Sequence, residues 1–85
     1  NYPNPFNSRT KIRFYSEYNN SISINIINLN GKIIKKIINN TVLMGYHTFD
    51  WDGTNDIGVP VSAGIYFVSI RSNDGIHTRK MVLLK

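Results

Sequence analysis

The feature that most constrains the fold of this chain is a period-two alternation of apolar and polar residues. Residues 21–26, SISINI, place three isoleucines on one face and three small polar side chains on the other. Residues 11–15, KIRFY, begin the same alternation nearer the start. A strand repeats its side-chain direction every two residues, and β-branched residues favour strands. Both segments are therefore predicted to be strands with one buried face.

Three further segments are apolar enough to form strands. Residues 46–51 alternate and end at Trp51, a predicted core anchor, while residues 65–70 begin with apolar residues on both faces and are predicted to be central. Residues 77–84 supply the last strand. Tyr66 follows a loop corner, a placement from which a tyrosine hydroxyl can donate to the backbone just upstream.

Residues 32–38, KIIKKII, match two structures. Their isoleucines would form one face of an amphipathic helix, which could lie on an anionic membrane. Seven residues are too few for a stable helix, so a strand is the favoured interpretation. Lysines on both of its faces are typical of an edge strand.

Turn residues separate these segments. Asn30-Gly31 predicts a hairpin with a two-residue type I′ turn, and residues 73–75, NDG, predict another hairpin. Residues 52–58 have the composition of a long loop. Six or seven strands and no convincing helix predict an all-β fold, a small antiparallel β-sandwich of about seven strands.

Length and composition bound the function. The 85 residues make one domain, residues 1–85, with a thin core and little room for a catalytic cleft. There is no cysteine for a disulfide or a thiolate. An initial asparagine indicates a piece of a longer polypeptide with its targeting signal upstream. No run of apolar residues is long enough for a membrane span.

No group of residues has the pattern of a catalytic or cofactor site. Asp50, Asp52, Asn55 and Asp56 could offer oxygens to calcium, but they lack the pattern of a calcium-binding loop and suit turns equally well. The two histidines stand in no zinc or nucleophile motif. We expect no enzyme activity, no metal and no cofactor.

A net charge of +5 raises the possibility of nucleic-acid binding. The ten basic residues are spread along the whole chain, however, which is typical of solvated strand faces. We therefore expect no nucleic-acid partner.

Three stretches together carry a resemblance to a known family. They are YPNPFNSRTKIRF at the start, WDGTNDIGVPVSAGIYFVSI in the middle and TRKMVLLK at the end. The chain resembles, over residues 1–85, the type A C-terminal sorting domain of proteins exported by the bacterial type IX secretion system. The middle stretch is also similar to the immunoglobulin-like domain of flagellar hook-capping proteins.

The resemblance implies an immunoglobulin-like sandwich of seven strands at the end of a larger secreted protein, often a hydrolase or adhesin. Such a domain is a non-catalytic secretion signal, read by the outer-membrane type IX translocon and commonly cleaved after export to the cell surface or medium. The alternative is a structural module of a hook cap or multidomain surface protein. The positions that match the family's motifs are Pro3, Asn4, Pro5, Phe6, Gly64, Tyr66, Lys80, Met81, Val82, Leu83, Leu84 and Lys85. One departure is Asn7-Ser8, where the family often has a further proline.

Both ends of the chain allow two interpretations. Each proline fixes its own φ and disfavours helix at the preceding residue, so residues 2–6 are predicted to be an extended strap. The strap either is read directly by the export machinery or only covers an open end of the core. Residues 81–84, MVLL, are either core residues of the last strand, a binding edge, or both.

A third function, carbohydrate binding, would need an exposed stacking platform of Tyr46, Phe49 and Trp51. Burial of Trp51 would argue against it.

Overall fold

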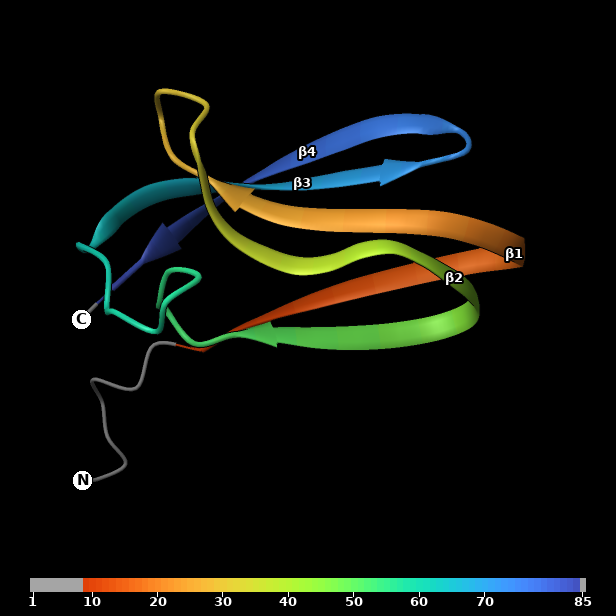
Figure 1. Ribbon diagram of the computed structural model, residues 1–85, viewed down its shortest axis with the longest axis horizontal. Helices are drawn as coiled ribbons and strands as arrows, with labels where there is room; N and C mark the ends of the chain where they lie inside the picture. The colour runs from red at the N-terminus through yellow and green to blue at the C-terminus, as the bar shows by residue number, and fades with distance from the viewer. Residues whose placement is uncertain (1–8, 85) are drawn as a thin grey trace.

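The computed structural model describes residues 9–84 as an all-β, antiparallel structure (Figure 1). Its strands are β1 (Thr10–Ile27), β2 (Ile33–Trp51), β3 (Gly64–Ser72) and β4 (Gly75–Leu83). They form one sheet in the order β2-β1-β3-β4. The all-β, antiparallel prediction is confirmed, and β3 has the expected central position.

The described residues form four strands where about seven were expected. The predicted strands at 11–15 and 21–26 are both parts of β1, and those at 32–38 and 46–51 are both parts of β2. Shifts of register between β1 and β2, the largest between Ser16 and Asn20, interrupt the pairing without ending either strand. Such bulges bend a strand and increase its twist, so bends replace the expected breaks.

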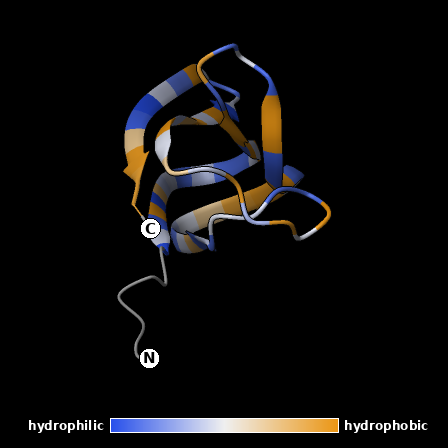
Figure 2. Ribbon diagram, turned by 90° about the vertical axis from the view of Figure 1, so that its left-hand side faces the viewer, coloured by the Kyte–Doolittle hydropathy of each residue, from blue (hydrophilic) through white to orange (hydrophobic). Residues whose placement is uncertain are grey.

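The bends fold the sheet over on itself. Residues 23–27 of β1 pair with β3, whereas residues 10–16 pair only with the end of β2, from Gly45 to Trp51. In Figure 1 both long ribbons turn back at one end of the molecule, and in Figure 2 the strands curve around one interior. Residues 10–16 of β1 and 45–51 of β2, named here the short layer, therefore lie across the interior from β3.

The core lies between these two parts of the sheet. It holds Ile12, Ile22, Ile24, Ile26, Trp51, Tyr66, Val68, Ile70 and Leu83. The alternation in residues 21–26 is confirmed, because all three of its isoleucines are fully buried. Trp51, which is 1% exposed, is the predicted core anchor. Its indole Nε1 donates to the carbonyl of Thr54 at 2.8 Å, so the polar group of this side chain is paired as well.

The hairpin at Asn30-Gly31 is present, but its predicted turn type is wrong. The Asn28 amide donates to Lys32 O and the Gly31 amide to Asn28 O. A type I′ turn needs positive φ at both central residues, and here Gly31 has φ +82° while Asn30 does not have a positive φ. The Asn28 side chain also accepts from the Asn30 and Lys32 amides at 2.9 Å. These bonds favour a loop over residues 28–32 in place of a two-residue turn.

The second predicted hairpin is confirmed, with Ser72 paired to Gly75 across residues 73–74. The long loop after Trp51 is also present and lies against the outer edge of β2. The Asp56 amide donates to Ile34 O at 3.1 Å, and the Lys36 amide donates to Asp56 Oδ1 at 2.9 Å. The loop thus pairs part of an edge that would otherwise be open, as edge strands require.

Candidate functional site

Tyr66 makes the corner contact predicted from the sequence. Its hydroxyl donates to the carbonyl of Ser62 at 2.6 Å, four residues upstream. Its ring, only 7% exposed, packs edge-on against Trp51 with the ring centroids 5.3 Å apart. The ring of Tyr66 therefore belongs to the core, and its hydroxyl group holds the turn that precedes β3.

Gly64 begins β3 opposite Leu83 of β4 and has φ +148°. No heavy atom outside its chain neighbours lies within 4 Å of the place where a Cβ would stand. Glycine is therefore favoured here by the backbone conformation and not by a close contact.

Four of the predicted C-terminal positions, Lys80 to Leu83, form the end of β4, an edge strand of the sheet. Along this strand Leu83 is 2% exposed and belongs to the core, whereas Val82 is 54% exposed and Lys80 is also on the surface. Met81 is partly buried against the core. The interpretation as a last, partly core-forming strand is confirmed, while its use as a binding edge stays a prediction.

The register of β3 and β4 brings two groups of predicted positions together. Gly64 is paired with Leu83, and Tyr66 is paired with Met81. Leu84 follows the strand and is exposed. The other predicted recognition residues, Pro3, Asn4, Pro5, Phe6 and Lys85, lie outside the described residues.

The aromatic platform expected for carbohydrate binding is not formed. Trp51 is buried and Phe49 packs against the core, whereas Tyr46 is 85% exposed. The ring of Tyr46 instead lies 4.4 Å from the ring of Tyr15 on the neighbouring strand. The three rings therefore share no exposed face on which a sugar could stack.

Several of the residues weighed for metal binding and catalysis make contacts within the fold. Asp52 Oδ1 accepts from the hydroxyl and the amide of Thr54, and chiefly the hydroxyl bond lowers the pKa of Asp52. His47 Nε2 lies 2.9 Å from Met44 O. Among the described residues no group of three His, Cys, Asp or Glu is placed to hold a metal ion.

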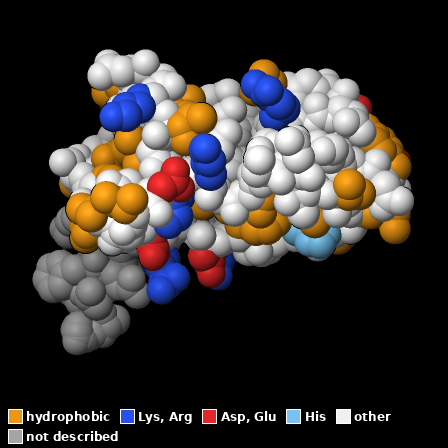
Figure 3. Space-filling view, viewed as in Figure 1, with side chains coloured by type: hydrophobic (Ala, Val, Ile, Leu, Met, Phe, Trp, Pro, Cys, Tyr) orange, Lys and Arg blue, Asp and Glu red, His pale blue; other side chains and the backbone are white. Residues whose placement is uncertain are grey.

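The distribution of surface charge bears on nucleic-acid partners, and helix length and apolarity bear on a membrane span. On the face in Figure 3 the Lys and Arg side chains stand apart from one another, and several have Asp or Glu beside them. One ion pair joins described residues, Lys11 and Asp50 at 3.2 Å on the surface. Within residues 9–84 no helix has the length and apolarity needed to cross a membrane.

A polar cluster between β1 and the β3–β4 turn was missed by the sequence analysis. The Tyr18 hydroxyl lies 2.5 Å from both carboxylate oxygens of Asp74, and Asn20, only 1% exposed, accepts from the Asn73 amide at 2.9 Å. The hydrogen bond to Asp74, with smaller effects of desolvation and of the Asp74 charge, raises the pKa of Tyr18. The two residues from β1 are more than 50 positions away from the two in the β3–β4 turn. Taken alone, each of the four is an ordinary loop residue in the sequence.

Comparison with known proteins agrees with the resemblance seen in the sequence. The family model described as "Secretion system C-terminal sorting domain" matches residues 1–84. Searches of curated proteins and of solved structures found no match. Because the family match covers residues 1–84, which hold the first two quoted stretches and all but the last residue of the third, this chain belongs to the family of C-terminal sorting domains of the type IX secretion system.

Proposed function

We propose that this domain directs a passenger protein, linked to its N-terminal side, across the outer membrane through the type IX translocon and is cleaved off after export. The family match over residues 1–84 carries this proposal. The domain itself has no catalytic role in it, and a hydrolase activity would belong to the passenger. The route through the periplasm to the surface or medium belongs to the same proposal.

The proposed recognition surface consists of two segments. The first is the strap with Pro3, Asn4, Pro5 and Phe6, and the second runs from Lys80 to Lys85. The outer edge of β4 has no partner strand among residues 9–84, so its backbone could pair with a strand of the translocon. Gly64 and Tyr66 would act indirectly, because the bond from Tyr66 to Ser62 O closes the turn into β3 and Gly64 lets the backbone enter that strand with positive φ.

We also propose that the complete domain is an immunoglobulin-like sandwich. The folding of β1 and β2 over a single core supports two facing layers. A solved structure of the domain joined to its native upstream residues would test the expected count of about seven strands.

The function is tested by fusing residues 1–85 to a foreign periplasmic protein in a bacterium with an active type IX system. We expect the fusion in the medium or on the surface, and in the periplasm when the translocon is inactivated. Retention in both strains would contradict the proposal, as would equal export in both.

Direct reading of the strap is tested by replacing Pro3 and Pro5 with alanine. If the export machinery reads the strap, the secreted fraction falls while the melting temperature stays near that of the parent domain. An equal loss of stability and export would show that the strap only covers the core.

A further inference from the structure

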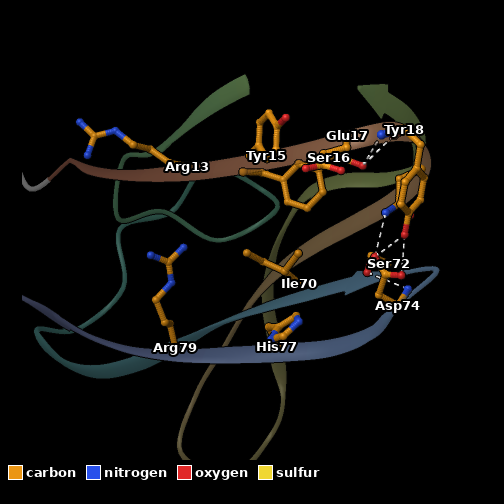
Figure 4. Close-up of a pocket in the computed structure, with 12 residues that line it drawn as sticks. Arg13, Tyr15, Ser16, Glu17, Tyr18, Ile70, Ser72, Asp74, His77 and Arg79 are labelled. Atoms are coloured by element: carbon orange, nitrogen blue, oxygen red, sulfur yellow. Dashed lines mark hydrogen bonds between the residues drawn. The ribbon is translucent and has the colours of Figure 1, made fainter. Parts of the chain in front are cut away.

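A groove runs between β1 of the short layer and the β3–β4 hairpin. Its larger part has a volume of about 570 Å³ and is lined by residues 13–18 of β1 and by Ile70, His77 and Arg79. A smaller cavity of about 100 Å³, named here the smaller part, shares Arg79 with it and is lined by residues 10–12 and Met81. Figure 4 shows β1 along one side of the larger part and Arg79 extending toward it from β4 on the other.

The two sides of the groove present different parts of their strands. Successive side chains of a strand point to opposite faces. Residues 13–18 of β1 line the groove without a gap, so the groove runs along the edge of this strand. From β4 only alternate residues, His77 and Arg79, line the larger part, so this strand presents a face.

The exposed edge of β1 is unpaired within the described part of the chain. Residues 10–16 pair with β2 on one side, and pairing with β3 begins only at Ser23. On the open side the backbone donors and acceptors of this segment can accept another strand, the arrangement known as β-augmentation. The groove beside this edge, about 570 Å³ in its larger part, gives room for such a strand.

The face of β4 that lines the groove is on the same side of the sheet as the core. It nevertheless carries polar residues. Arg79 is paired with Val68 and His77 with Ile70, and both partners are buried core residues. Arg79 and His77 therefore point to the same side of the sheet as the core but remain exposed. A strand added to β1 would cover both side chains.

The positive side chains in the groove favour an added strand that carries negative charge. Arg13 and Arg79 line the larger part and Lys80 the smaller one, and none of the three forms an ion pair or side-chain hydrogen bond with another described residue. The acidic residues Glu17 and Asp74 lie at the opposite end, which the bond from Tyr18 to Asp74 closes (Figure 4).

We propose that this groove is an acceptor site for an extended segment of an acidic partner protein. The segment pairs with the open edge of β1 and places a carboxylate against Arg79. A second copy of this chain, with its net charge of +5, is a poor match for the same groove. Residues 1–8 of the chain carry no carboxylate side chain and contain two prolines, which cannot donate to a ladder.

The test is an NMR titration of the ¹⁵N-labelled full chain with the peptide acetyl-Thr-Val-Thr-Val-Thr-Glu-Thr-amide, compared with the same peptide carrying Lys for Glu. We expect the acidic peptide to bind about tenfold more tightly or better. The shifted amides should lie in residues 10–18 and around Arg79. Shifts confined to the outer edge of β4, or no binding of the acidic peptide, would overturn the proposal.

Two charge reversals separate the groove from the general charge of the domain. Arg79→Glu should weaken binding of the acidic peptide by about tenfold. Arg71→Glu, the matched control, makes the same change on the outer face of β3 and should leave binding nearly unchanged. Equal effects of the two variants would show nonspecific attraction. An inward charge can also serve only to discourage edge pairing, and equally weak binding of both peptides would show that role instead.

Two other occupants are tested on the wild-type chain without peptide. Slow amide hydrogen exchange in residues 10–16 that becomes fast when residues 1–8 are deleted would identify the chain's own N-terminal segment as the occupant. Protection that rises with protein concentration, together with a dimer in light scattering, would identify a second copy. Either result would overturn the proposal.

Discussion

At the residue scale, two of the positions that match the family's motifs have clear structural roles. Tyr66 closes the turn into β3 by its bond to Ser62, and Gly64 allows the backbone to enter that strand with positive φ. A loss of export on replacing either residue would therefore have to be compared with the loss of folding stability.

Tyr66→Phe should lower the free energy of unfolding by about 1 kcal/mol, because the ring remains while the hydrogen bond to Ser62 O is lost. Urea unfolding followed by Trp51 fluorescence measures this. Tyr46→Phe removes a hydroxyl from a side chain that is 85% exposed and should have almost no effect. Equal effects of the two variants would contradict the structural role of the Tyr66 hydroxyl.

Gly64→Ala should destabilise the domain by about 1–3 kcal/mol, the usual cost of holding a side-chain-bearing residue in a glycine conformation. The cost comes from the backbone, since no neighbour crowds the added methyl group. Thermal unfolding would show it as a lower melting temperature. A variant as stable as the parent but defective in export would show instead that the export machinery contacts Gly64.

At the element scale, the polar cluster of Tyr18, Asn20, Asn73 and Asp74 fastens the bend of β1 to the β3–β4 turn. The sequence analysis could not find it, because its members acquire partners only when the hairpin lies beside β1. The same holds for the acceptor groove, whose two sides come from segments far apart in the chain.

The raised pKa of Tyr18 gives this cluster a pH dependence. A tyrosine whose pKa is higher in the folded than in the unfolded protein stabilises the fold fully below the unfolded pKa, near 10.0. That stabilisation is lost as the pH rises through the folded pKa. Absorbance titration of tyrosinate should therefore show that Tyr18 ionises at a higher pH than an ordinary tyrosine.

Asp74→Asn supplies the test of this assignment. It removes the carboxylate acceptor and should bring the pKa of Tyr18 back toward its ordinary value. The ionisation of Tyr18 should then move to lower pH in the titration. An unchanged titration curve in Asp74→Asn would show that the bond to Asp74 does not control the ionisation.

At the scale of the whole molecule, stability depends on one core shared by all four strands. Ile24→Ala should cost about 2–5 kcal/mol, because it opens a cavity at a fully buried position. Since small domains have a total stability of only about 5–15 kcal/mol, this is a large fraction. Chemical denaturation gives the measurement, with the exposed Val42→Ala as control. A loss of less than about 1 kcal/mol in Ile24→Ala would contradict a shared core.

How far the sequence could predict the fold depended on the range of the interactions involved. The alternation in residues 21–26 depends only on side-chain direction along a strand, so burial of its isoleucines followed directly. The hydrogen bond from Tyr66 to Ser62 spans only four residues, so it could also be predicted from the sequence. The turn at Asn30-Gly31 was not, because the competing bonds to the Asn28 side chain are not part of the dipeptide's own preference.

The sequence by itself determined the all-β class, the core face of the alternating segments at residues 11–15 and 21–26 and, through its three ordered stretches, the sorting-domain family. Only the tertiary structure decided that four of the expected strands join into two long bent ones and that Tyr46, Phe49 and Trp51 share no exposed face. It alone also placed an open edge of β1 opposite Arg79. The physical reason is that strand pairing and edge exposure depend on which distant segments meet, and local alternation does not encode that choice.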